Sequence, residues 1–381
     1  MALTSKLPGV GTTIFTVMSQ LAARCDAINL SQGYPDFEPP ARLIERVEKH
    51  LRGGSNQYAP MSGLPALRHA IATKLANCYG TRNSADDEIT VSSGATEALF
   101  CAVQSVVRHG DEVVLLDPAY DAYQPAVELA GGRAIHVPLS RPDFAVDWDR
   151  VSDAVGPRTR LIVVNSPHNP SGAVFKQGDL DALGSLLRNR DAFVLSDEVY
   201  EHMVFDGREH CSLLRSEELA ARSFVVSSFA KTYHATGWKV GYCVAPRELT
   251  AEFRKVHQFV QFAVATPLQA AIADFIEECP QHHDELSAFY QRKRDLFCAL
   301  LEATRFGFKP AEASYFQLAD YSDVSAAPDT EFARWLTSEI GVAAIPVSVF
   351  SEAPPEERLV RFCFAKSDET LRAAGDRLAA V

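Results

Sequence analysis

The chain has few of the features that mark nucleic-acid-binding, membrane-spanning or secreted proteins. Its 381 residues include 37 Lys and Arg against 49 Asp and Glu, a net charge of −12, whereas nucleic-acid binders usually carry a basic surplus or stripe. No apolar run approaches the roughly 18 residues that a membrane-spanning helix needs, and the first residues lack the apolar core of a secretion signal. These absences favour a cytoplasmic protein with no nucleic-acid and no membrane partner.

Eight cysteines are too scattered to form a metal or redox motif. No two of them have the two-residue gap of such motifs, and most lie in apolar segments, as Cys101 does, so we interpret them as small core residues. His282 and His283 stand where a helix is expected to begin, where polar residues are ordinary. We interpret them as surface residues and expect no metal site. The basic run 292–294 is interpreted as the solvated face of a helix.

Short apolar runs alternate with helical patterns between residues 60 and 250, which predicts a largely parallel α/β sheet. The clearest predicted strands are hydrophobic on both faces, as strands covered by helices are. They are Glu112–Asp117, Arg160–Asn165, Ala192–Asp197 and Ser223–Ser228. A further strand, Lys239–Ala245, follows too soon for a crossover helix, and we expect it to run antiparallel to its neighbours.

After Pro246 the pattern changes to long helical stretches, with two short strand-like pieces at Tyr315–Ala319 and Leu359–Phe364 and a helix at Thr330–Ile340. The first forty residues are punctuated by Gly and Pro, and we expect them to pack onto this C-terminal part. The sequence therefore predicts a large domain at residues 40–280 and a smaller α+β domain formed by residues 1–39 and 281–381.

Two polar clusters follow predicted strands with small or rigid residues, at the sheet edge where parallel α/β proteins bind ligands. Ser92–Ala98 opens a helix with small residues, which suits either an anion site or an ordinary helix cap. Asn165–Gly172 is a proline-rich loop that is either a plain turn or a rigid support for Asn169 through a cis Asn169–Pro170 bond.

Two further clusters place a carboxylate and an amine at strand ends. Asp197 ends an apolar strand, where it either caps a helix or meets a cationic partner supplied by a ligand. Lys231 lies just past another buried strand; it either points outward or, pointing inward, becomes a nucleophile with a lowered pKa.

Taken together and in this order, these motifs resemble the fold-type I pyridoxal-phosphate enzymes of the class I and II aminotransferase family. The resemblance runs from Asn29–Phe37 (NLSQGYPDF) to Arg361–Phe364 (RFCF). Within the family, the stretches Asn165–Pro170 and Ser227–Tyr242 are most similar to bacterial methionine aminotransferases and kynurenine aminotransferases. The resemblance implies a large domain with a mostly parallel seven-stranded sheet, plus a smaller α+β domain.

The resemblance also implies pyridoxal 5'-phosphate as the cofactor. Catalytic roles would fall to Lys231, which forms a Schiff base with the cofactor and moves the substrate proton, to Asp197, which pairs with the ring nitrogen, and to Tyr200. Tyr200 and Asn169 would bond the phenolic oxygen, and Tyr120 would stack on the ring. The phosphate group would be held by Gly94, Ala95, Thr96, Ser228, Lys239 and, from the other subunit of a homodimer with shared active sites, Tyr58.

The substrate site is implied in the same way. Arg361 would grip the α-carboxylate of an amino acid or 2-oxo acid, because its planar fork suits bidentate binding. The other substrate-binding residues would be Gly33, Asn169, Phe15, Tyr34 and, from the neighbouring subunit, Phe262. Apolar and aromatic side chains favour methionine and aromatic substrates, since sulfur packs well against rings. Lys239, where aspartate aminotransferases carry arginine, weakens an aspartate-aminotransferase interpretation.

The expected function is therefore a ping-pong aminotransferase that moves the amino group of methionine or an aromatic or large neutral amino acid to a 2-oxo acid. The alternatives with similar chemistry are a kynurenine–oxoglutarate transaminase and a cysteine-S-conjugate β-lyase. Two rivals come from other classes. Ser228 and Lys231 have the Ser-x-x-Lys spacing of penicillin-binding proteins, and some pyridoxal-phosphate proteins are regulators fused to a DNA-binding domain.

Overall fold

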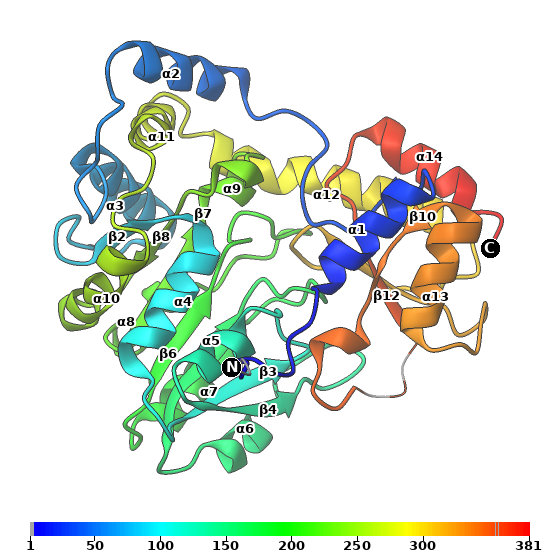
Figure 1. Ribbon diagram of the computed structural model, residues 1–381, viewed down its shortest axis with the longest axis horizontal. Coiled ribbons are helices and arrows are strands. Elements are labelled where there is room, and N and C mark those ends of the chain that lie inside the picture. Colours follow the sequence, from blue (N-terminus) through cyan, green and yellow to red (C-terminus); the bar gives the residue numbers. More distant parts are fainter. Residues whose placement is uncertain (1–3, 355, 357) are drawn as a thin grey trace.

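The centre of the computed structural model, which describes residues 4–354, 356 and 358–381, is a seven-stranded sheet with helices on both faces (Figure 1). In order across the sheet, the strands are β2 (Ile89–Ser92), β8 (Gly241–Val244), β7 (Ser223–Ser228), β6 (Phe193–Asp197), β5 (Thr159–Asn165), β3 (Glu112–Asp117) and β4 (Arg133–Pro138). Neighbours from β7 to β4 pair in parallel, and β8 runs antiparallel to both β2 and β7. The mostly parallel sheet and the antiparallel direction of the strand within Lys239–Ala245 are thus confirmed.

Alternate residues of each strand point to opposite faces of the sheet, and each face has its own helices. In β3, Val114 and Leu116 pack on one face, and Val113 and Leu115 pack on the other. The first face is covered by α3 (Pro65–Tyr79), α6 (Trp148–Ala154), α7 (Gln177–Leu187) and α11 (Thr266–Glu278). The second is covered by α4 (Gly94–Val106), α5 (Tyr123–Leu129) and α10 (Arg247–Val260). Burial on both faces explains the continuous apolar runs of these strands.

A second apolar core joins the N-terminal residues to the C-terminal part of the chain. Met18 and Leu30 pack in one cluster with Phe297 and Phe362, and Figure 1 shows α1 (Ile14–Arg24) against the C-terminal elements. The helices here are α12 (His282–Leu301), α13 (Asp329–Trp335), continued by a turn of π-helix at Leu336–Ile340, and α14 (Asp368–Leu378). The division into domains at residues 40 and 280 stays a prediction.

Two small sheets complete this second core. One is antiparallel, in the order β11 (Ile345–Pro346), β12 (Leu359–Cys363) and β9 (Phe316–Asp320). In the other, β1 (Ile28–Asn29) pairs in parallel with β10 (Val342–Ala343). The remaining helices are α2 (Ala41–Arg52), which packs on α11, and the one-turn helices α8 (Glu217–Ala220) and α9 (Phe229–Thr232). Among the described residues, no helix is both long and apolar enough to cross a bilayer.

Two interpretations of surface residues are wrong in part: Arg292 is exposed as expected and His282 is half-buried, but their neighbours are not at the surface. His283 is buried and its Nε2 lies 2.9 Å from the Tyr233 hydroxyl. Lys293 and Arg294 are also buried: Lys293 donates to the carbonyl oxygen of Lys366, and Arg294 binds the Asp206 carboxylate. Both stretches lie on α12, and each of these three buried side chains has a specific hydrogen-bond partner.

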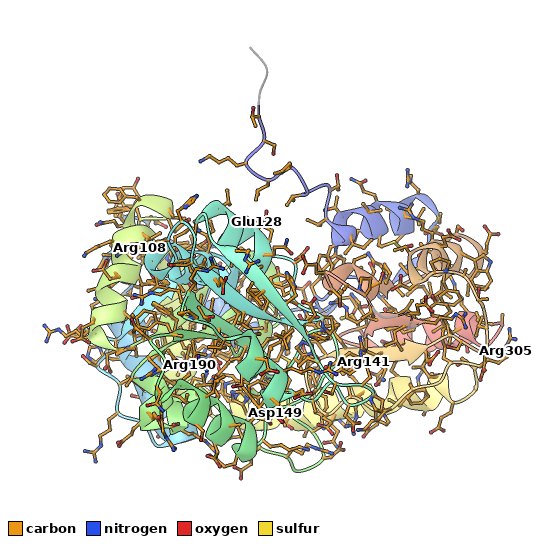
Figure 2. The ribbon with its side chains drawn as sticks, turned by 90° about the horizontal axis from the view of Figure 1, so that it is seen from below. Arg108, Glu128, Arg141, Asp149, Arg190 and Arg305 are labelled. Atoms are coloured by element: carbon orange, nitrogen blue, oxygen red, sulfur yellow. The ribbon has the colours of Figure 1, made fainter. Side chains whose placement is uncertain are left out.

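The parallel strands bring four polar residues to one edge of the central sheet. β3 ends at Asp117, β5 at Asn165, β6 at Asp197 and β7 at Ser228. This edge faces the second core, because Tyr200, just beyond β6, packs in that cluster. Figure 2 shows residues 4–13, which precede α1, leaving the body as an extended arm, and most of these residues are exposed.

Candidate active site

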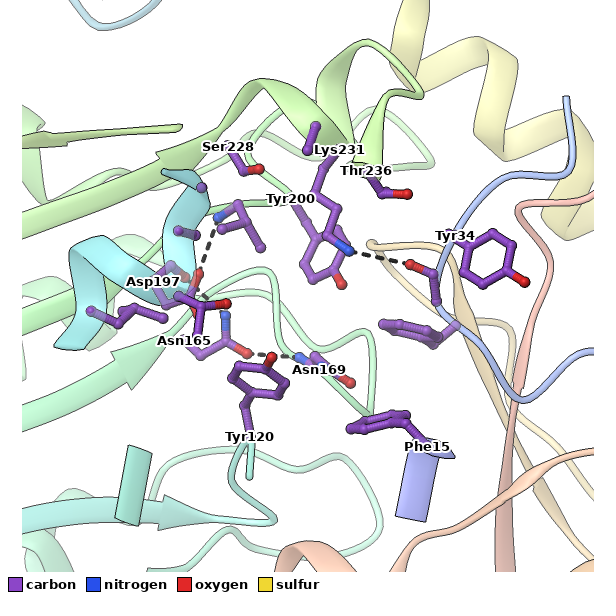
Figure 3. Close-up of a pocket in the computed structure, with 18 of the residues that line it drawn as sticks. Phe15, Tyr34, Tyr120, Asn165, Asn169, Asp197, Tyr200, Ser228, Lys231 and Thr236 are labelled. Carbon is purple, nitrogen blue, oxygen red and sulfur yellow. Dashed lines mark hydrogen bonds between the residues drawn. The ribbon is translucent and has the colours of Figure 1, made fainter. Parts of the chain in front are cut away.

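A cavity of about 280 Å³ lies at the carboxyl edge of the sheet, between the central sheet and the second core. Fourteen of the predicted site residues line it: Phe15, Gly33, Tyr34, Gly94, Ala95, Thr96, Tyr120, Asn169, Asp197, Tyr200, Ser228, Lys231, Lys239 and Arg361. Figure 3 shows Lys231, Asp197, Asn169 and Tyr120 converging on it from different segments. The other two, Tyr58 and Phe262, do not line it; both are exposed, and their ring centroids lie 5.5 Å apart.

Lys231 points inward from the short helix α9, directly after β7. Its Nζ donates hydrogen bonds to the Tyr315 hydroxyl at 2.8 Å and to the Gly33 carbonyl oxygen at 3.2 Å. Burial lowers the pKa of Lys231 to about 8, and the nearby Lys239 and Arg361 act in the same direction. Roughly a tenth of this amine is therefore neutral and nucleophilic at pH 7, far more than for an exposed lysine.

Asp197 presents a buried carboxylate at the end of β6. Its Oδ2 accepts a 2.7 Å hydrogen bond from the Tyr123 hydroxyl, and its Oδ1 accepts one from the Val199 amide at 3.3 Å. Burial raises the pKa of Asp197 to about 6, while the Tyr123 hydrogen bond opposes that rise. Sequence reasoning missed Tyr123; the available signal was its position three residues after Tyr120, at the start of α5.

The start of α4 is shaped to accept an anion. Gly94 has φ +74°, and a Cβ added there would come within 3.3 Å of the Lys239 Nζ. A Cβ at Gly241 would lie 3.0 Å from the Ala95 nitrogen, so side chains at either position would fill the space beside these backbone groups. Since Ser93 makes no side-chain cap, the first amides of this 13-residue helix, its positive dipole end and the Lys239 ammonium are together suited to a phosphate group.

Arg361 is a fully buried cation on β12. Its Nη1 donates to Asn169 Oδ1 at 2.7 Å and its Nη2 to the Ser31 carbonyl oxygen at 3.1 Å, while the ring of Phe316 lies 3.9 Å from the guanidinium. Within the part of the chain that the structure describes, no carboxylate forms an ion pair with it. Burial lowers the pKa of Arg361, so an anionic ligand group placed here would be strongly favoured.

The loop after β5 holds Asn169 rigidly. Asn165 donates from Nδ2 to the Asp197 carbonyl oxygen at 2.8 Å and accepts from the Asn169 amide at 2.8 Å. The Asn169–Pro170 bond is cis, as the sequence analysis suggested. Because Asn169 Oδ1 faces Arg361, its Nδ2 is left to donate to a ligand.

Three aromatic residues around the site were also missed. Tyr315 contacts the Lys231 amine, and Phe316 and Phe350 surround the Arg361 guanidinium. Their only sequence signal was their position in or beside the short C-terminal strands. The geometry does not support the serine acyl-transfer alternative. The Lys231 amine is hydrogen-bonded to Tyr315 and Gly33, and the described side chains of Lys231 and Ser228 make no hydrogen bond to each other.

Comparisons with known proteins agree with this geometry. The model of the family "Aminotransferase class I and II" matches residues 26–378. A methionine aminotransferase from Escherichia coli is 52% identical over 374 residues, which cover 98% of this chain and 97% of that protein. The kynurenine–oxoglutarate transaminase 1 of Mus musculus is more distant, at 33% identity over 409 residues that cover 98% of this chain and 96% of that protein.

Solved structures give the same answer. A structure from Escherichia coli, described as having a methionine aminotransferase function, superposes with a TM-score of 0.98 at 51% identity and covers 100% of both chains. The N-succinyldiaminopimelate aminotransferase of Mycobacterium tuberculosis superposes with a TM-score of 0.96 at 38% identity, also over 100% of both chains. The chain therefore belongs to the class I and II aminotransferase family, whose members are pyridoxal-phosphate-dependent enzymes.

Proposed function

We propose that this chain binds pyridoxal 5'-phosphate and transfers the amino group of methionine, or of another large neutral or aromatic amino acid, to a 2-oxo acid in a ping-pong reaction. The observation that carries the proposal is one cavity that joins an inward-pointing, partly buried amine, Lys231, a buried carboxylate, Asp197, and a buried arginine, Arg361. Each of these groups is costly to bury alone, and a zwitterionic cofactor together with an α-carboxylate would partner all three.

The residues around the cavity fit the cofactor. The amides of Ala95 and Thr96, with Ser228 and Lys239, would hold its phosphate at the start of α4. Asp197 would pair with the ring nitrogen, and Tyr120 would stack on the ring. Bound there, the cofactor would supply an aldehyde that links covalently to an amine and a ring that accepts the electrons of the substrate Cα–H bond.

Tyr200 and Asn169 would bond the phenolic oxygen of the cofactor. Tyr200 is buried, and its ring packs edge-on against Tyr315 at 5.0 Å and Phe316 at 5.8 Å. Burial raises the pKa of Tyr200 far above its usual value, so its hydroxyl keeps its proton and can donate it. The free Nδ2 of Asn169 supplies the second donor.

Replacing Tyr123 with phenylalanine should weaken cofactor binding. The change removes the hydroxyl donor to Asp197 Oδ2 and so raises the pKa of Asp197, which favours the neutral acid that cannot pair with a charged ring nitrogen. Hydrogen bonds to charged groups contribute about 1.5–3 kcal/mol, so we expect the cofactor dissociation constant to rise roughly 10- to 150-fold. Absorbance titration of the apoprotein with pyridoxal phosphate measures it.

Tyr321 offers the matched control for this substitution. It is also a buried tyrosine, but its hydroxyl donates to the Ala327 carbonyl oxygen, away from the cavity. Tyr321→Phe should leave the dissociation constant unchanged. Equal affinity of the Tyr123→Phe protein and the unmodified protein would contradict the role of Tyr123.

The main chemical role of the chain's own residues would be to move the proton of the substrate Cα. The neutral Lys231 amine would take the proton from the substrate Cα and return it to a carbon of the cofactor, which is general acid–base catalysis by a single group. Arg361 would hold the α-carboxylate with its fork and so orient the Cα–H bond toward the amine. Full burial of Arg361 excludes water that would compete for its fork.

The side-chain pocket supports a neutral substrate. Phe15, Tyr34 and Phe316 line the cavity, and its only cations among the described lining residues are Lys231, Lys239 and Arg361. Each of these already has a partner in the proposal, so no cation is left for an acidic side chain. The 52% identity to a methionine aminotransferase favours a thioether side chain, which packs well against aromatic rings.

A panel of amino donors tests the substrate class. With one 2-oxo acid as acceptor, methionine should give a kcat/KM at least about tenfold above that of aspartate, since one missing charge partner is worth several kcal/mol in a buried site. Phenylalanine and kynurenine should fall between them. Preference for aspartate would contradict the proposal, and pyruvate and ammonia released from a cysteine S-conjugate without any acceptor would instead favour the β-lyase.

We also propose a homodimer with shared active sites. Tyr58 is 84% exposed and Phe259 is 86% exposed, next to the exposed Phe262, and monomers seldom expose a cluster of large aromatic residues. The exposed arm before α1 offers a further contact. A second copy would bring Tyr58 to the phosphate and Phe262 to the substrate pocket. A monomer that retained full activity in sedimentation-velocity fractions would contradict this arrangement.

A further inference from the structure

The Tyr315 hydroxyl lies between the Lys231 amine and the Gly33 carbonyl. It is 2.8 Å from Lys231 Nζ and 2.5 Å from the Gly33 carbonyl oxygen, and Lys231 Nζ is itself 3.2 Å from that oxygen. Three polar atoms from distant parts of the chain therefore form a closed triangle. Neither the family match nor the predicted site explains why a tyrosine should stand at this point.

The positions of the hydrogens in this triangle follow from its chemistry. The Tyr200 hydroxyl is a further hydrogen-bond neighbour of Tyr315. The Gly33 contact decides the position of the proton, because two oxygens at 2.5 Å need a hydrogen between them and the Gly33 carbonyl has none to give, so the single Tyr315 proton lies on that side. Burial raises the pKa of Tyr315 well above its usual value, which keeps this proton in place. Tyr315 must then accept, rather than donate, in its contact with Lys231.

The consequence for Lys231 is a fixed orientation. A neutral amine has two N–H bonds and one lone pair, and the contacts with Tyr315 and Gly33 use both N–H bonds. The lone pair can then point only away from these two oxygens. A general base must present its lone pair to the proton that it removes, and a lysine amine would otherwise rotate freely at the end of its stem.

The Tyr315 ring is held firmly enough to set that orientation. It is fully buried, with ring centroids of Tyr200 at 5.0 Å, Phe316 at 4.9 Å and Tyr290 at 5.8 Å. A Cβ on Gly33 would lie 2.8 Å from the Phe316 ring, so the Gly33 segment is seated closely on the same aromatic group. Lys366 also holds that segment by donating to the Tyr34 carbonyl oxygen at 2.8 Å.

We propose that Tyr315 is a positioning residue for the amino transfer: it accepts a hydrogen bond from the free Lys231 amine and, with the Gly33 carbonyl, aims the amine's lone pair for proton transfer. The inference rests on the proposed function, in which Lys231 is the base. It adds a residue that the predicted site lacked, and it links the base to the Gly33 segment beside the substrate carboxylate.

The test compares Tyr315→Phe with Tyr290→Phe. Tyr290 is also a buried tyrosine of this aromatic group, but its hydroxyl lies 2.9 Å from His234 Nδ1 and does not touch Lys231. For Tyr315→Phe we expect kcat to fall about 10- to 100-fold with a smaller change in KM, and the isotope effect of an α-deuterated donor to rise, because proton transfer becomes slower. Tyr290→Phe should change neither.

A second readout uses the apoprotein and needs no turnover. The pH dependence of Lys231 labelling by an amine-specific reagent, followed by mass spectrometry, gives the midpoint at which the amine loses its proton. Loss of the Tyr315 acceptor disfavours the ammonium form, so the midpoint should fall by about one pH unit in Tyr315→Phe. The other charged or titratable groups around the amine, Asp197, Lys239, Arg361, Tyr200 and Cys363, are the same in both variants.

A replacement of nearly the same shape at position 315 separates the effect of the hydroxyl from any misfolding of Tyr315→Phe. Incorporating 3-fluorotyrosine at position 315 keeps the ring and the hydroxyl but weakens the oxygen as an acceptor, so it should lower the midpoint in the same direction by less. Unchanged midpoints in both position-315 variants, or an equal shift in Tyr290→Phe, would overturn the inference. Failure of the unmodified protein to attach pyridoxal phosphate at Lys231 would instead overturn the proposed function.

Discussion

Replacing Lys231 with alanine is expected to lower kcat at least about 10⁴-fold. A positioned acid–base group raises the reaction rate roughly 10²–10⁴-fold by proton transfer alone. No other lysine could replace it, because among the described residues that line the cavity only the Lys231 amine lies within hydrogen-bond reach of both Tyr315 and Gly33. The binding residues remain in place, so the purified variant should still take up pyridoxal phosphate without a covalent link. Steady-state assays with methionine and a 2-oxo acid measure the loss.

Lys255→Ala is the matched control for this change. Lys255 is exposed and pairs with Glu252 within α10, so its removal should leave kcat within experimental error. A small external amine, which can enter the space left by the lysine stem, should restore part of the activity of Lys231→Ala and none of it in the control. Turnover by Lys231→Ala at the level of the unmodified protein would contradict the account.

The pH dependence of cofactor uptake also tests the assignment of Lys231 as the amine that attaches the cofactor. The neutral amine is the nucleophile, and burial lowers the pKa of Lys231 to about 8. The rate at which the apoprotein attaches added pyridoxal phosphate should therefore rise with pH as the amine loses its proton near pH 8. An exposed lysine would not approach its maximal rate until well above pH 10.

Replacing Arg361 with glutamine should be the second most damaging change. Arg361 is a buried cation with two neutral oxygen partners and an aromatic ring, and the substrate α-carboxylate is its proposed counter-ion. Removing one partner of a buried, hydrogen-bonded charge pair costs about 2–5 kcal/mol, which corresponds to a fall in kcat/KM of roughly 30- to 5,000-fold. Initial-rate kinetics with methionine measure this fall.

A substrate analogue provides the control for Arg361. 3-(Methylthio)propylamine has the side chain and amine of methionine without the α-carboxylate, so it should react poorly with both proteins and lose nothing further in Arg361→Gln. An equal loss with methionine and with the amine would mean that Arg361 supports the fold rather than the carboxylate, and would contradict its assignment.

The strands that carry the site could be predicted because burial on both faces leaves a plain signature. The uninterrupted apolar runs before Asp197 and Ser228 gave β6 and β7 nearly residue for residue. The clearest predicted strands did not include β2, which has only four residues, or β4, which is a partly exposed edge strand without such a run. In the C-terminal part, the expected helix at Thr330–Ile340 is divided between α13 and a turn of π-helix.

The cavity residues nearest those strand ends were predictable because the strands themselves could be located in the sequence. The hydrogen-bond partners of these residues were not predictable. Tyr123 lies 74 residues from Asp197 in the sequence, and Tyr315 lies 84 residues from Lys231. Contacts at such separations depend on how helices and the second core pack against the sheet, which residue spacing does not encode. His283 and Lys293 were predicted to lie at the surface although they are buried. Their hydrogen-bond partners lie on other parts of the chain, which the pattern of their own helix does not reveal.

In the proposed function, pyridoxal phosphate attaches covalently to the Lys231 amine. Borohydride reduction of the purified holoprotein, proteolysis and mass spectrometry locate the attachment directly. We expect one pyridoxyl phosphate per chain, on the peptide that contains Lys231, with Lys239 and Lys74 unmodified. A modified lysine elsewhere, or a Lys231 peptide that carries no label in an active preparation, would contradict it.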